Sequence, residues 1–135
     1  MTTLPLTGSC LCGGVAFSVR SEPLDFRYCF CESCRKATGS AHASNLIVPL
    51  DGLIWTRGES LIGRFVEQRA NPGFPVWFCR SCGSFLPHIG RSGKVYVVPA
   101  GLIDSPPGLR PRLVMCRDEA PDWYLPAGEL PDAEG

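Results

Sequence analysis

The fold and the chemistry of this chain depend on one stretch, Cys29-Phe30-Cys31-Glu32-Ser33-Cys34-Arg35-Lys36. It places three thiols within six residues and follows them with two cations. Three cysteines are one ligand short of a closed tetrahedral site, in which a structural zinc ion takes four protein ligands. A catalytic zinc ion instead keeps one position open for water or substrate. The function of the chain therefore depends on whether this stretch finds a fourth ligand.

Length and composition favour a single domain over residues 1–135. We expect its core to span about residues 7–123 and the tail, residues 124–135, to be partly disordered. Basic and acidic side chains balance at 13 each, which argues against a nucleic-acid-binding protein. The N-terminal residues lack the pattern of a signal peptide, and the apolar runs are too short to cross a bilayer, so we expect a cytoplasmic protein. In that reducing compartment, eight cysteines indicate metal binding or catalysis in preference to disulfide bonds.

The hydrophobic pattern predicts a mainly β fold, because short β-rich runs alternate with turn formers such as Asp51-Gly52 and Ser92-Gly93. The predicted strands are Val15–Arg20, Phe26–Cys29, Ser44–Pro49, Leu53–Thr56, Ser60–Glu67, Pro75–Phe78, Val95–Pro99 and Arg112–Cys116. One short helix is predicted over about Glu32–Thr38. Gly39 is placed to end it, because glycine tolerates the positive φ of a helix C-terminus.

The other cysteines form two further motifs and one isolated residue. Cys10-Leu11-Cys12 precedes Gly13-Gly14, and Cys79-Arg80-Ser81-Cys82 precedes Gly83, as in a zinc knuckle whose glycine permits a tight turn. The simplest partition combines these two motifs into one closed site and leaves the middle motif open. The closed site would contain Cys10, Cys12, Cys79 and Cys82, and the open site Cys29, Cys31 and Cys34. A second arrangement closes the middle motif with Cys116, His42 or His88.

Two features of the middle region also have ordinary interpretations. The isolated Cys116 lies in an apolar run, where a cysteine is more often a small buried hydrophobe than a ligand. Arg35 and Lys36 could form a solvated helix face. Next to three thiols and a helix N-terminus, however, these cations would lower thiolate pKa values and attract an anionic ligand. We therefore take Arg35 and Lys36 as candidate substrate-binding residues.

Taken together, the motifs resemble those of the glutathione-dependent formaldehyde-activating enzymes, also called the Gfa or centromere-protein-V-like family. The resemblance is carried by the segments Gly8–Phe17, Cys29–Ser40 and Phe78–Gly83, and it spans about Thr7 to Trp123. It implies an Mss4-like fold of small coiled antiparallel sheets, with zinc knuckles and a short helix after the middle cysteine motif. It also implies two zinc sites, a structural one on Cys10, Cys12, Cys79 and Cys82 and a catalytic one on Cys29, Cys31 and Cys34.

The activity implied by the resemblance joins glutathione to formaldehyde and gives S-hydroxymethylglutathione, a carbon–sulfur lyase reaction. A thiolate-rich metal site suits this chemistry, because a thiol bound to the metal is deprotonated. Phe30, Phe85 and Trp77 are candidates for an apolar wall, and His42 or His88 for a proton shuttle. Two residues depart from the family pattern. The family often has His at the position of Phe30, and an aromatic residue or His near the position of Cys116. The alternative function is a non-catalytic two-zinc module that binds glutathione, a protein or nucleic acid.

Overall fold

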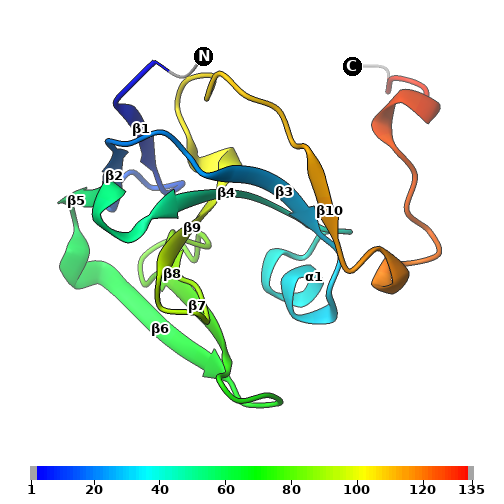
Figure 1. Ribbon diagram of the computed structural model, residues 1–135, viewed down its shortest axis with the longest axis horizontal. Coiled ribbons are helices and arrows are strands. Elements are labelled where there is room, and N and C mark those ends of the chain that lie inside the picture. Colours follow the sequence, from blue (N-terminus) through cyan, green and yellow to red (C-terminus); the bar gives the residue numbers. More distant parts are fainter. Residues whose placement is uncertain (1–2, 134–135) are drawn as a thin grey trace.

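The computed structural model describes residues 3–133, which form ten strands and one α-helix (Figure 1). The strands are Leu6–Ser9 (β1), Ala16–Val19 (β2), Asp25–Cys29 (β3), Ala43–Pro49 (β4), Leu53–Arg57 (β5), Ile62–Glu67 (β6), Phe74–Cys79 (β7), His88–Ile89 (β8), Val95–Pro99 (β9) and Leu113–Met115 (β10). The helix α1 spans Glu32–Thr38. No helix within residues 3–133 is long and apolar enough to span a membrane.

The strands form three small sheets. A three-stranded sheet has the order β1-β2-β5, a five-stranded sheet the order β10-β3-β4-β9-β8, and β6 and β7 form a two-stranded hairpin. The mainly β fold of small sheets is therefore confirmed. The prediction of antiparallel pairing holds for most pairs, but β10 runs parallel to β3, with Met115 opposite Cys29. This parallel edge brings Cys116, which directly follows β10, next to the middle cysteine motif.

Two clusters of buried side chains hold the sheets together. The larger cluster joins the three-stranded and five-stranded sheets and consists of Leu6, Phe17, Val19, Phe26, Leu46, Val48, Leu53 and Val98. The smaller cluster consists of Cys10, Val15, Ile62, Cys79 and Leu86 and connects the first sheet to the β6–β7 hairpin. Because fully burying one such aliphatic or aromatic side chain contributes about 1.5–3 kcal/mol, both clusters stabilise the fold. One cysteine of each outer motif, Cys10 and Cys79, thus belongs to the core.

Helix α1 begins and ends at the residues that its sequence predicts. Cys31 is the N-cap, and its Sγ accepts a hydrogen bond from the N–H of Cys34 at 3.3 Å. Gly39 ends the helix with φ 65°, and its N–H donates to the carbonyl of Arg35 at 2.8 Å. A thiol thus replaces the hydroxyl or carboxylate oxygen that usually caps a helix. The middle cysteine motif is both the cap of this helix and the start of the candidate site.

The predicted strands agree with the structure to within two residues at each end, and two short strands escape the prediction. β1 has only four residues and includes a glycine, whereas β8 has only two. Neither is long enough to show an alternating pattern. We expect the tail, residues 124–135, to be partly disordered. Within it, Ala127–Glu129 forms a 3-10 turn, and residues 134–135 lie outside the described residues.

Candidate functional site

The first and third cysteine motifs come together as a four-sulfur cluster. The Sγ atoms of Cys10, Cys12, Cys79 and Cys82 all lie within 4.8 Å of one another. Cys10 Sγ is 3.6 Å from Cys12 Sγ, which is 3.9 Å from Cys79 Sγ. A tetrahedral site with zinc–sulfur bonds of about 2.3 Å separates its sulfur atoms by about 3.8 Å. The four residues could therefore hold a metal ion, and the donor set fits zinc.

Backbone N–H groups surround these sulfur atoms. Val15 donates to Cys10 Sγ at 3.3 Å, Gly14 to Cys12 Sγ at 3.4 Å and Ser81 to Cys79 Sγ at 3.4 Å. Hydrogen bonds to a thiolate favour its charged form. Each turn also contains a glycine in the left-handed region, with φ 77° for Gly13 and φ 81° for Gly83. The turns thus direct amides at sulfur, and the glycines permit the tight turns that the sequence predicts for zinc knuckles.

The Cys82 thiol at the outer edge of this cluster is poised to ionise. Its Sγ lies 3.3 Å from the Ser84 hydroxyl. Hydrogen bonding by Ser84 lowers the pKa of Cys82 to about 5. A thiol that is already deprotonated at neutral pH is ready to bind a cation, so the local electrostatics agree with a metal-binding role.

The middle motif forms a second cluster of three sulfur atoms, from Cys29, Cys31 and Cys34, again within 4.8 Å of one another. Cys29 ends β3, Cys31 caps α1, and Cys34 lies in the first helical turn with 6% of its surface exposed. A hydrogen bond from Cys34 lowers the pKa of Cys29 to about 5, and the same hydrogen bond raises the pKa of Cys34. The first thiolate of this cluster therefore forms at Cys29. Three sulfur ligands leave one position of a tetrahedral metal ion free.

A cavity of about 690 Å³ opens beside the three-sulfur cluster and not beside the four-sulfur cluster. Figure 1 shows α1 and the β6–β7 hairpin on the same side of the five-stranded sheet, and the cavity is lined by residues from all three. Its volume lies within the range of small-molecule sites, about 300–1,000 Å³. The apolar part of its wall includes Ile47, Ala70, Phe74, Pro75, Phe85, Val97 and Met115. The three sulfur atoms thus face a space large enough for a substrate.

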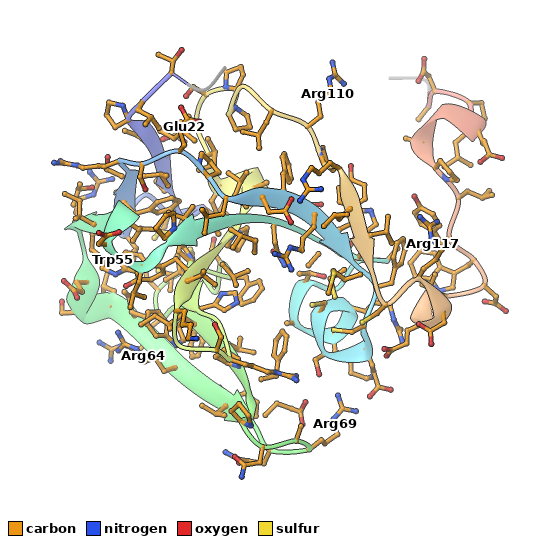
Figure 2. All side chains as sticks on the ribbon, viewed as in Figure 1. Glu22, Trp55, Arg64, Arg69, Arg110 and Arg117 are labelled. Carbon is orange, nitrogen blue, oxygen red and sulfur yellow. The ribbon has the colours of Figure 1, made fainter. Side chains whose placement is uncertain are left out.

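The mouth of the cavity is held together by Arg69, at the end of the β6–β7 hairpin that faces α1 (Figure 2). Its guanidinium forms ion pairs with Glu32 of α1 and with Glu67 of β6, and it donates to the Ser33 hydroxyl at 3.1 Å. Arg27 and Arg91 also line the cavity. The charge of Arg69 is offset by its two carboxylate partners, so its role is to tie the hairpin to the helix. Arg91 forms no ion pair with the described residues and lies over the Phe74 ring, so it can attract an anionic ligand.

The predicted substrate-binding cations lie elsewhere. Among the described residues that line the cavity, neither Arg35 nor Lys36 is present. Arg35 Nε donates to the Phe30 carbonyl at 3.3 Å, and Lys36 is exposed. Successive helical residues are rotated by about 100°, so the residues that follow Cys34 turn away from the face that Cys34 presents to the cavity. The cations at the site are Arg27, Arg69 and Arg91 instead.

Of the three predicted wall residues, only Phe85 lines the cavity within the described chain. Phe30 is 4% exposed and packs on His42 and Tyr124, with ring centroids 5.1 and 5.0 Å apart. Cys29 and Cys31 face the cavity, and the intervening residue of an extended segment points to the opposite side. Trp77 packs beside Trp55 and Tyr96 and lies under the Arg64 guanidinium. The prediction that Phe30 and Trp77 form the wall is therefore wrong.

The two histidines have different environments. His42 stacks on Tyr28, with ring centroids 4.1 Å apart, and contacts the tail through Tyr124, away from the cavity. His88 is 3% exposed and lines the cavity beside Phe85, on which it stacks. Only His88 of the pair is thus placed to meet a ligand in this cavity.

Cys116 also lines the cavity. It has a positive φ of 55°, and burial raises the pKa of its thiol to about 12. Its Sγ lies outside the group of three sulfur atoms that are within 4.8 Å of one another. The structure thus brings Cys116 to the edge of the three-sulfur cluster without making it an equivalent member.

The sequence reasoning missed several cavity residues, among them Arg27, Asn45, Arg69 and Arg91. Arg27 could have been found, because it lies two residues before Cys29 on the same strand and must share its face. Asn45 then follows from the pairing of β3 with β4, but that pairing is not visible in the sequence. Arg69 and Arg91 come from turns far along the chain, so no local pattern connects them with the cysteines.

Comparison with known proteins identifies the family of the chain. The sequence profile of a family described as glutathione-dependent formaldehyde-activating enzyme matches residues 5–118. The chain belongs to this family. A protein of Halomonas elongata named "Putative glutathione-dependent formaldehyde-activating enzyme" is 36% identical over 124 residues, which cover 87% of this chain and 78% of that protein. The fold matches a crystal structure of a Rhodobacter sphaeroides protein with a TM-score of 0.62 and 29% identity, over 81% of this chain and 98% of that one.

Proposed function

We propose that this family member is a zinc-dependent carbon–sulfur lyase of the S-hydroxymethylglutathione synthase type, which joins a small thiol such as glutathione to formaldehyde. One observation carries the proposal: the incomplete sulfur cluster lines a ligand-sized cavity, whereas the complete cluster is joined to the core through Cys10 and Cys79 and does not line that cavity within the described residues. An open coordination position beside a cavity is typical of a catalytic zinc site, and a closed position of a structural one. The cysteines are all free thiols within residues 3–133, which fits the cytoplasmic location that we include in the proposal.

The residues present fit two zinc ions. Cys10, Cys12, Cys79 and Cys82 would hold the structural ion, and Cys29, Cys31 and Cys34 the catalytic one. When bound at the open site, the catalytic zinc ion supplies positive charge that keeps a substrate thiol in its thiolate form. The low pKa of Cys29 favours this site further, because metal binding requires deprotonated ligands.

The chemistry itself is an addition. The thiolate sulfur forms a bond to the carbonyl carbon of formaldehyde, the carbonyl π electrons move to oxygen, and that oxygen takes up the proton that the thiol released. The chain's own residues position the two reactants for this step. Ile47, Phe85 and Val97 contribute apolar surface to the cavity wall, which limits the access of water. Arg91 supplies positive charge for a carboxylate of a thiol such as glutathione.

Metal content and turnover test the proposal together. Wild-type protein should hold two zinc equivalents and accelerate the exchange between free and hydroxymethylated glutathione above the uncatalysed rate, measured by NMR exchange spectroscopy. Cys34→Ser should hold one equivalent, remain folded and lose the acceleration. Lys36→Ala is the matched control, because this side chain is exposed and does not line the cavity within the described residues. It should leave both the zinc content and the acceleration unchanged.

Two outcomes would count against the enzyme. Full acceleration by a folded Cys34→Ser protein would remove the middle site from the reaction. A wild-type protein that holds both ions, binds glutathione and does not accelerate the exchange would support the non-catalytic module instead.

A further inference from the structure

The segment that follows β10 contacts the middle cysteine motif at two points. β10 ends at Met115, and Arg117–Glu119 forms a 3-10 turn beside the start of α1 (Figure 1). The Phe30 N–H donates to the Met115 carbonyl at 3.0 Å, and the Glu32 N–H donates to Glu119 Oε1 at 3.1 Å. The proposed reaction gives neither of these hydrogen bonds a role.

The two bonded amides lie on either side of Cys31. Phe30 and Glu32 are its neighbours in the chain, so the hydrogen bonds fix the backbone before and after this cysteine. Cys31 is also the N-cap of α1, and its Sγ accepts a hydrogen bond from the Cys34 N–H at 3.3 Å. The relative positions of the Cys31 and Cys34 sulfur atoms therefore depend on the direction in which the chain enters the helix. The segment of residues 115–119 sets that direction.

The backbone of Cys116 makes the second contact possible. Among the described residues, Cys116 is the only residue other than glycine with a positive φ, 55°. This left-handed conformation is unfavourable for a residue with a Cβ atom, and it persists only where the surrounding structure enforces it. Here it ends β10 and begins the turn, in which the Glu119 N–H donates to the Cys116 carbonyl at 2.9 Å. The turn brings the Glu119 carboxylate back to the Glu32 N–H.

Glu119 acts on the three-sulfur cluster through the backbone and not as a further ligand. Its side chain lines the cavity, but its carboxylate is not part of the group of ligand atoms that lie within 4.8 Å of one another. Glu119 is also exposed, and replacing an exposed side chain usually changes the free energy of unfolding little. A change in metal binding upon its replacement would therefore not result from unfolding.

From these contacts we infer that Glu119 is a positioning residue for the zinc ion of the open site. Its hydrogen bond to the Glu32 N–H holds Cys31 and Cys34 at the spacing that a shared metal ion requires. Groups that hydrogen-bond to the surroundings of a metal ion orient its ligands and thereby raise its affinity. Glu119 and Glu32 are 87 positions apart, so a segment near the end of the chain completes a site built near its beginning. The inference rests on the proposed function for the presence of zinc at this site.

The test measures the zinc affinity of the open site and not turnover. The protein is titrated with zinc in competition with a chromogenic chelator, and the binding event that Cys34→Ser lacks is assigned to the open site. Glu119→Ala should weaken this event about tenfold, as expected for losing a group that orients metal ligands, and should leave the other event unchanged. Glu119→Gln keeps an acceptor oxygen at the same reach and should bind zinc like wild type. Glu119→Asp keeps the charge on a side chain that is one methylene shorter, and it should resemble Glu119→Ala.

Asp118→Ala is the matched control, because it removes an exposed carboxylate from the same turn. Asp118 does not line the cavity within the described residues, so both binding events should stay unchanged. If Glu119→Ala does not fold, the comparison of Glu119→Gln with Glu119→Asp decides the same question.

The outcomes separate this inference from the proposed function. Equal affinity of wild type and Glu119→Ala at the open site, or an equal loss for Asp118→Ala, overturns the role of Glu119. If the affinities are equal and glutathione exchange is catalysed, the role of Glu119 alone is overturned. The expected loss of affinity without catalysed exchange overturns the reaction alone, and a wild-type protein that holds only one zinc equivalent overturns both.

Discussion

Replacing Cys79 by serine should destabilise the whole domain, and the structure sets the size of the effect. Cys79 is 1% exposed and lies in the smaller buried cluster, with Sγ 3.9 Å from that of Cys12. These two residues are 67 positions apart, so a metal ion that binds both closes a loop of that length. In the chain-entropy description, closing such a loop disfavours the unfolded state by about 4 kcal/mol. This is a large part of the stability of a typical domain, about 5–15 kcal/mol.

The middle motif supplies a matched comparison. Its three cysteines lie within six residues, and a metal ion there closes only a short loop, which by the same relation is worth about 2 kcal/mol. Cys34→Ser should therefore cost about half as much as Cys79→Ser. Ser81→Ala, at an exposed position between Cys79 and Cys82, should be close to neutral.

The assay is urea unfolding followed by circular dichroism, with and without a chelator that removes zinc. A loss of about 4 kcal/mol corresponds to a fall in melting temperature on the order of 15 °C, which a thermal scan would detect easily. Chelation should lower the stability of wild type and have little further effect on Cys79→Ser. An unchanged unfolding midpoint upon chelation, or a larger loss for Cys34→Ser than for Cys79→Ser, would refute the assignment of the four-sulfur cluster as the stabilising link.

Three further predictions concern single positions. Arg69→Ala should raise KM for glutathione about tenfold in steady-state kinetics with a smaller effect on kcat, because Glu32 and Glu67 are then left unpaired in the cavity wall and repel the anionic substrate. Lys36→Ala should leave both constants unchanged, and equal effects of the two variants would contradict this. Gly39→Ala should lower the free energy of unfolding by about 1 kcal/mol, since φ is +65° there, while Gly101→Ala, with open space around its Cα and no positive φ, should be neutral in the same denaturation assay. Burial lowers the pKa of His88 from 6.5 to about 4 in the folded protein. As the pH falls, the unfolded chain therefore binds a proton at His88 before the folded protein does. The free energy of unfolding should fall progressively from about pH 6.5 to pH 4, by up to about 3 kcal/mol. His88→Gln should flatten that part of the pH–stability curve, and parallel curves for the two proteins would disprove the role of His88.

The features that could be predicted from the sequence are those that depend on short-range patterns. Helix α1 was predictable because its cap, Cys31, and its terminating Gly39 are both local signals. The grouping of the outer cysteines was also predictable, because a knuckle with two thiolates needs a second pair to complete a tetrahedral site. The structure brings these four sulfur atoms together.

What could not be predicted depends on which strands pair and on which way side chains turn. The parallel edge that places Cys116 at the cavity requires a connection of many residues between β3 and β10. Arg69 reaches Glu32 from a hairpin that is 37 residues away along the chain, so its role at the mouth could not be found locally. Arg35 lies next to the thiols in sequence but not in space, because one step along a helix changes the direction of a side chain by about 100°.

Strand β7 has a consequence for regulation of the cavity by the distant metal site. Its first residue, Phe74, lines the cavity, and its last residue, Cys79, belongs to the four-sulfur cluster. A strand of six residues is about 20 Å long, so β7 connects two parts of the molecule that are otherwise far apart. Here one end would be fixed by metal, and the neighbouring β6 carries Glu67, the anchor of Arg69. Zinc occupancy of the four-sulfur cluster should thus affect the position of the hairpin residues that line the cavity, although none of its cysteines touches the cavity within the described residues.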